Sequence, residues 1–100
     1  MEKEEYVKEF IKTINSQDEE NIYHFFTRNS SIALLSKNKE IDLPSLVSYL
    51  KENYFGKEIV IVRELKSKVC NKLETKVDSK DVSFYFEIKD RRIGRLEILD

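Results

Sequence analysis

The chain has 100 residues, enough for one domain, because folding at this length buries roughly 60 to 70 per cent of the unfolded surface. Hydrophobic residues make up 40% and charged residues 37%, so the composition differs from that of a disordered chain. The 18 basic and 19 acidic residues are mixed along the chain and give a formal charge of −1. We therefore expect no single-sign field and no nucleic-acid partner.

Membrane insertion and secretion are not expected either. No apolar run approaches the ~18 residues that a membrane span requires, and residues 1–5 form neither a basic leader nor an apolar segment. Cys70 is the only cysteine, so an intrachain disulfide is impossible, as is usual in a reducing compartment. These features predict a cytoplasmic protein with one domain over residues 1–100.

A first helix is predicted from Glu5. The polar stretch 15–18 ends it. Its apolar residues recur with the i, i+3, i+4, i+7 spacing of one helix face, namely Val7, Phe10, Ile11 and Ile14.

A second helix is predicted to run to about Phe26, and the polar residues 27–30 are predicted to separate it from the next element. The apolar run 32–35 predicts a first strand, and a short return strand is expected near Ile41. Two pairs have the spacing that caps the second helix, Ser16 with Glu19 and Asp18 with Asn21.

The third helix has the clearest pattern. Asp42 and Pro44 are typical of a helix start, and Gly56 is typical of a residue that follows a helix end. Between them the helical spacing is kept by Leu43, Leu46, Val47, Leu50 and Tyr54.

After Gly56 the apolar residues alternate with a period of two, which predicts strands over 58–69, 73–77, 82–89 and 93–99. Polar turns at 78–81 and 90–92 separate the last three. Tyr85 alternates away from the core side of its strand. The element order predicts an α+β domain with three amphipathic helices followed by an antiparallel sheet.

This order resembles the nuclear transport factor 2 like superfamily, which includes SnoaL-like and ketosteroid isomerase-like proteins. Residues 7–18 look like the family's first helix and its asparagine, small residue, aspartate corner, and residues 86–93 resemble its closing hairpin. Arg91 stands where the family prefers glycine, so the turn must avoid a positive φ there or accept a strain of about 1 kcal/mol.

The resemblance implies a cone: three N-terminal helices packed in a strongly curved antiparallel sheet, the cystatin-like α+β barrel, often with a ligand or active site inside. Ketosteroid isomerase relatives use a helix-one tyrosine and a first-strand aspartate. Those positions fall here on Phe10 and near Leu34, which can neither donate nor accept a proton. Steroid-type enolisation is therefore not expected.

Three other residues carry side chains that could take part in chemistry. His24 lies nearly opposite the apolar stripe of its helix, which favours a solvent-facing side chain over a catalytic base. Cys70 is read as a partly buried small hydrophobe. Tyr54 could direct its hydroxyl into a cone, although such a tyrosine more often packs its ring and finds a backbone partner.

No catalytic residue, metal site or cofactor is predicted from these patterns. The leading expectation is a non-catalytic domain that binds a small apolar ligand in its cone or acts as a homodimeric interaction module through the sheet, where Tyr85 would contact the partner. One alternative is a small enzyme of the cyclase, isomerase or hydrolase type. Another is an adaptor or regulatory domain that binds a different protein through the outer face of the sheet. The helix stripes and the strand alternation predict a candidate pocket wall made of Phe10, Ile14, Phe26, Leu34, Tyr54, Phe84 and Phe86.

Overall fold

The computed structural model describes residues 3–100, with side chains from residue 5 onward. The expectation made for residues 1–2 lies outside this range. No helix among residues 3–100 is long and apolar enough to cross a membrane. The helical elements are α1 (Lys3–Asn15), α2 (Glu19–Tyr23), the 3₁₀ turn η1 (Leu35–Lys37) and α3 (Leu43–Asn53).

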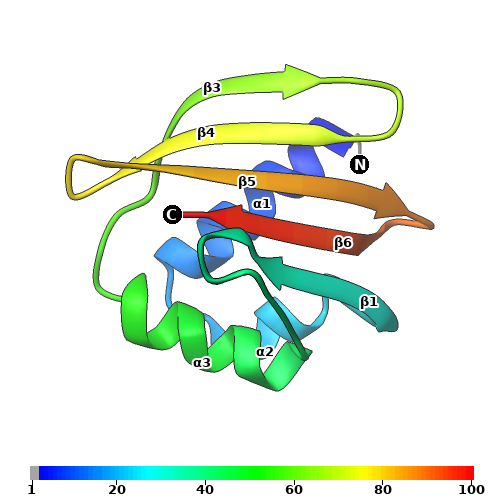
Figure 1. Ribbon diagram of the computed structural model, residues 1–100, viewed down its shortest axis with the longest axis horizontal. Coiled ribbons are helices and arrows are strands. Elements are labelled where there is room, and N and C mark those ends of the chain that lie inside the picture. Colours follow the sequence, from blue (N-terminus) through cyan, green and yellow to red (C-terminus); the bar gives the residue numbers. More distant parts are fainter. Residues whose placement is uncertain (1–2) are drawn as a thin grey trace.

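The described strands form one six-stranded sheet in the order β2-β1-β6-β5-β4-β3 (Figure 1). Neighbouring strands are antiparallel except β1 and β6, which are parallel. The strands are β1 (Phe26–Leu34), β2 (Lys39–Ile41), β3 (Val60–Lys66), β4 (Asn71–Val77), β5 (Lys80–Lys89) and β6 (Arg92–Leu99).

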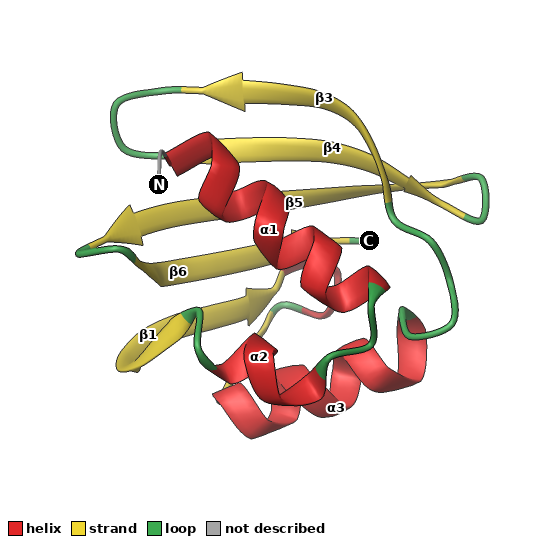
Figure 2. Cartoon of the chain, turned by 180° about the vertical axis from the view of Figure 1, so that it is seen from behind, coloured by secondary structure: helices red, strands yellow, loops and turns green. Residues whose placement is uncertain are grey.

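The helices cover one face of the sheet. Figure 2 shows α1 crossing that face, with α2 and α3 beside β1. The opposite face of the sheet is turned toward the viewer in Figure 1 and carries no helix of the described chain. The predicted class, three helices packed in a curved antiparallel sheet, is confirmed, with the difference that β1 and β6 pair in parallel.

The first helix buries the stripe that its spacing predicts, since Val7, Phe10, Ile11 and Ile14 are all inaccessible to solvent or nearly so. Its last residue, Asn15, holds the chain that enters β3. The Asn15 amide donates to the Ile59 carbonyl at 3.0 Å, and its oxygen accepts from the Ile59 amide at 2.8 Å. Asn15, the asparagine of the corner motif, therefore fixes the end of α1 to the residue that precedes β3.

The second helix is shorter than predicted. Of the two candidate caps, Asp18 is the N-cap, and its carboxylate accepts from the Asn21 amide at 3.3 Å. The helix ends at Tyr23. The prediction that it reaches Phe26 is wrong, because the backbone of Phe25 and Phe26 pairs with Ile93 of β6. The Ile93 amide donates to the Phe25 carbonyl at 2.7 Å, and Phe26 is paired with Ile93 in register.

The first strand begins earlier than the apolar run 32–35 predicts. Residues 27–30 are not a break but part of β1, in which their polar side chains are largely exposed. Ser30 donates to the Ile93 carbonyl at 2.6 Å, so a side chain reinforces the strand pairing. Leu35 already belongs to η1, whereas the return strand predicted near Ile41 is confirmed as β2.

The third helix agrees with its sequence signals. Asp42 caps it by accepting from the Ser45 amide at 2.9 Å, Pro44 lies in the first turn, and Gly56 has a φ of +85° beyond the end. Tyr54 follows the last helical residue, and its amide donates to the Leu50 carbonyl at 2.8 Å. The ring of Tyr54 is thereby directed toward the sheet.

Two tight hairpins connect the last three strands. Asp78 and Ser79 have φ values of 51° and 68°, and Asp90 and Arg91 have values of 51° and 61°. Two consecutive positive φ angles suit the right-handed twist of a hairpin. The sequence left open whether Arg91 avoids a positive φ or accepts one with its strain. The structure has the positive φ.

Candidate functional site

The seven residues of the predicted pocket wall come together in one place, the core between the helices and the sheet. All seven are buried. The Phe10 ring meets the Phe26 and Phe86 rings edge to face, with centroids 5.6 and 5.8 Å apart. Phe84 stacks on Phe86 at 6.2 Å and lies 6.3 Å from Tyr54. These are contact distances for aromatic rings, so the rings pack on one another.

The two positions where ketosteroid isomerase relatives place their proton-transfer groups belong to this core. Phe10 is fully buried in α1, and Leu34 is buried at the end of β1. Neither side chain carries an ionisable group. A base must lie within hydrogen-bond reach of the proton that it removes, so these two positions supply no acid–base chemistry.

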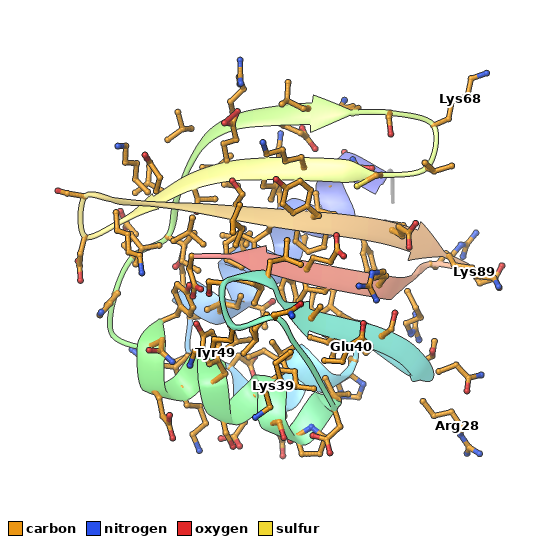
Figure 3. All side chains as sticks on the ribbon, in the orientation of Figure 1. Arg28, Lys39, Glu40, Tyr49, Lys68 and Lys89 are labelled. Carbon is orange, nitrogen blue, oxygen red and sulfur yellow. The ribbon has the colours of Figure 1, made fainter. Side chains whose placement is uncertain are left out.

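At the end of the core nearest α3, a polar cluster is present that the sequence did not predict. We call it the Asp100 cluster; it consists of Ser36, Tyr49, Tyr54 and Asp100. The Tyr54 hydroxyl donates to Asp100 Oδ2 at 2.6 Å, and the Tyr49 hydroxyl donates to the same oxygen. Ser36 donates to Asp100 Oδ1 at 3.0 Å. Figure 3 shows Tyr49 between α3 and the segment that carries η1.

The electrostatics of the cluster follow from these contacts. Burial raises the pKa of the Asp100 carboxyl, but the hydrogen bonds from the three hydroxyls and the nearby charge of Lys80 lower it more, so the pKa lies below its usual value. Burial, followed by the hydrogen bond to Asp100 and its negative charge, raises the pKa of both tyrosine hydroxyls. At neutral pH the cluster therefore holds one carboxylate and two protonated phenols.

A pocket of about 300 Å³ opens beside this cluster. The buried side chains Val77 and Val82 form part of its lining. Three lysines stand around it, from η1, from the α3–β3 connection and from the start of β5. The lining consists of Ser36, Lys37, Tyr49, Asn53, Tyr54, Lys57, Val77, Lys80, Val82 and Asp100.

A second carboxylate, Glu64, faces inward from β3. A bulge at Val62 puts two residues of β3 opposite one of β4, so the pairing shifts and Glu64 lies opposite the buried Leu73. The Glu64 side chain is 13% exposed, with Lys8 Nζ 3.6 Å from Oε1. Its Oε2 is buried without a hydrogen-bond partner among the described residues.

The other two candidate residues, His24 and Cys70, lie outside the Asp100 cluster. His24 is solvent-exposed, as predicted, and borders a shallow groove with Tyr6, Glu9 and Arg92. Cys70 is half-buried, and burial raises the pKa of its thiol, the opposite of what a nucleophile needs. Among residues 3–100, no three His, Cys, Asp or Glu side chains lie close enough to hold a metal ion.

The outer face of the sheet carries paired charges and a strip of apolar side chains. Arg63 Nε donates to Glu74 Oε1 at 2.6 Å, and Lys72 Nζ lies 5.3 Å from the centroid of the Tyr85 ring. Farther across the face, Arg95 bonds Glu97 at 2.8 Å and Glu40 at 3.2 Å. We define the outer patch as the side chains Val60, Val62, Leu65 and Tyr85, the first three of which are exposed on β3.

No family model matches the sequence. No curated protein matches it either. Solved structures, by contrast, match along almost the whole chain. A cystatin-fold protein of uncharacterised function from Novosphingobium aromaticivorans has a TM-score of 0.81 at 15% identity, covering 100% of this chain and 99% of that one.

Two further structures agree with this match. A SnoaL-like protein of unknown function from Burkholderia thailandensis has a TM-score of 0.78 at 11% identity, covering 95% of this chain and 91% of that one. A nuclear transport factor 2 like protein of unknown function from Cytophaga hutchinsonii has a TM-score of 0.76 at 12% identity, covering 98% and 88%. The chain has the nuclear transport factor 2 like fold that the sequence resemblance indicated.

Proposed function

We propose that this chain is a non-catalytic domain of the nuclear transport factor 2 like fold that works as a homodimeric interaction module through the outer face of its sheet. The observation that carries the proposal is the mutual packing of Phe10, Phe26, Phe84 and Phe86 in the interior. Where rings in contact occupy the place of a ligand, a binding role falls to the surface. We place this activity in the cytoplasm, because a single cysteine gives no intrachain disulfide.

The outer patch supports a second copy of this chain as the partner. Val62 is 62% exposed, and Val60 and Leu65 are exposed on the same edge strand. Exposed apolar side chains gathered on one face are typical of an interaction site. Tyr85 lies farther toward the middle of the same face, with Lys72 of β4 between it and Leu65. An aromatic ring with neighbouring aliphatic side chains is a common centre of a protein interface.

Charge complementarity supports the same arrangement. On the β3–β4 half of the outer face, Arg63, Lys72 and Lys76 outnumber Glu74. On the β5–β6 half, Glu87 and Glu97 outnumber Arg95, which pairs with Glu97. A two-fold axis between two copies would place the basic half of each over the acidic half of the other.

The alternative is a small enzyme of the cyclase, isomerase or hydrolase type. Two inward carboxylates, Glu64 and Asp100, favour it, as does the likeness to structures provisionally named SnoaL-like polyketide cyclases. Asp100 is already engaged by three hydroxyl groups, and Glu64 lies beside Lys8 under α1. Each carboxylate thus has a structural partner, which is why we rank the enzyme second.

Sedimentation equilibrium tests the dimer directly. We expect the wild-type chain to have twice its 11.9 kDa mass. Tyr85→Asp and Val62→Asp each place a charge in the outer patch and should yield monomers at the same concentration. The control is Tyr23→Asp, a substitution of a tyrosine that is also exposed but lies on α2, and it should leave the dimer intact. A wild-type chain that stays monomeric up to about 1 mM would refute the proposal, since this corresponds to a binding free energy weaker than about −4 kcal/mol.

A further inference from the structure

We propose that the pocket beside the Asp100 cluster binds a small organic anion that carries a hydroxyl group, the anion being a carboxylate or a phosphate. This inference goes beyond the interaction role and does not depend on it. The pocket lies beside the C-terminal part of α3, and none of the outer-patch residues lines it. Its volume, about 300 Å³, is at the lower end of the range for small-molecule sites.

The charges around the pocket favour an anion. Lys37, Lys57 and Lys80 line it together with one acidic residue, Asp100. Lys37 Nζ lies 5.0 Å from the centroid of the Tyr49 ring, and this contact holds a flexible side chain over the pocket wall. Lys57 Nζ lies 3.6 Å from Asp78 in an exposed ion pair, which water and salt weaken and which an entering anion can compete with.

The floor of the pocket, formed by the Asp100 cluster, can accept a hydrogen bond from a ligand. A carboxylate offers about four lone-pair sites. The hydroxyls of Tyr49 and Tyr54 occupy Oδ2 of Asp100, and Ser36 occupies one site on Oδ1, so Oδ1 retains room to accept another hydrogen bond. Because both phenol protons point to Asp100, the tyrosine oxygens can only accept from a ligand.

The two halves of the pocket therefore differ in what they recognise. The rim presents ammonium donors, and the floor presents acceptors from the Asp100 cluster. A plain anion satisfies the rim alone, and a neutral polyol satisfies the floor alone. A molecule with an oxyanion at one end and a hydroxyl at the other satisfies both, and each charge-assisted hydrogen bond adds more than a neutral one.

The test is a titration of the ¹⁵N-labelled wild-type chain, followed by amide chemical shifts, with glycerol 3-phosphate and with glycerate as probes. We expect saturable shifts at residues around the pocket, such as Ser36, Asn53 and Lys80, with at least one of the two. The stronger probe identifies phosphate or carboxylate as the preferred group. Inorganic phosphate and glycerol should each bind about tenfold more weakly, because each loses one half of the contacts.

Variants locate the site. Lys80→Gln should weaken the better probe by about tenfold, because it removes an ammonium donor. Lys76→Gln is the matched control, since this lysine lies on the outer face of β4 and pairs with Asp81 at 2.8 Å. The proposal is overturned if neither probe gives saturable shifts, if inorganic phosphate binds as tightly as the better probe, or if both variants weaken binding equally. Sedimentation of the same samples reports the dimer separately.

Discussion

The hydroxyl of Tyr54 donates a hydrogen bond of 2.6 Å to Asp100, a residue 46 positions farther along the chain. The bond joins the end of α3 to the end of β6. It closes one end of the core, because Tyr54 is 3% exposed and its ring lies against Phe84. The same carboxylate accepts from Tyr49 and Ser36, so one side chain ties three segments together.

Tyr54→Phe should therefore destabilise the domain although the ring is kept. We expect a loss of about 1 to 3 kcal/mol in the free energy of unfolding, because a hydrogen bond to a charged acceptor is removed. Urea denaturation followed by circular dichroism measures it. Tyr23→Phe, which removes the hydroxyl of an exposed ring, is the control and should change little. Equal stability of the two variants would contradict the role of the bond.

The Asp100 carboxylate should make stability depend on pH in a defined direction. Its pKa is lower in the folded chain than its usual value, so it stabilises the fold above its unfolded pKa of about 3.9 and loses that contribution as the pH falls through the folded pKa. The stability difference between wild type and Asp100→Asn should be largest near pH 7 and shrink by about pH 3. Urea titrations at both pH values measure it, and a difference that grows on acidification would contradict the assignment.

The orientation of α3 predicts a large effect of Leu50→Ala. Leu50 is fully buried, so the substitution should cost about 2 to 5 kcal/mol, out of the ~5 to 15 typical of a small domain. Glu52→Ala, on the exposed side of the same helix, should cost far less. Thermal and urea unfolding compare the two. A cost below about 1 kcal/mol for Leu50→Ala would mean that the helix does not face the core as described.

The positive φ of Arg91 predicts a stabilising substitution. Arg91→Gly should raise the free energy of unfolding by about 0.5 to 1 kcal/mol, because glycine adopts a φ of 61° without strain. Arg92→Gly should instead lower it by a similar amount, since Arg92 is the first residue of β6 and glycine weakens a strand. If both variants are equally destabilised, Arg91 stores no strain.

The sequence predicts those parts of the fold that rest on local periodicity. The stripe of α1, the signals around α3 at Asp42 and Gly56, and the alternation from Val82 to Ile88 all correspond to buried faces. The boundary at Phe26 could not be predicted in this way, because helix spacing and strand alternation both fit an apolar pair after a short helix. The pairing of Phe26 with Ile93, far along the chain, decides it.

The polar features of the candidate site depend on long-range geometry. The helical spacing predicts that Tyr54 faces the core, and a backbone partner is the usual one for such a tyrosine. Its partner in the structure is the carboxylate of Asp100, which no local pattern marks as an acceptor. Glu64 faces inward because the bulge at Val62 reverses the alternation of β3 after Ile61. A bulge leaves no reliable local signal, and the exposed valines of β3 resemble ordinary strand residues.

The packed interior can be tested most directly with xenon, which enters apolar cavities. The measurement is the shift of the methyl signals of Ile14 and Leu96, both fully buried, in the ¹³C-labelled wild-type chain under xenon pressure. Because both side chains are buried and the aromatic rings of the interior pack on one another, we expect no saturable shift. Saturable shifts at both residues would reveal a cavity in the cone, contradict a role confined to the surface, and return the apolar ligand to first place.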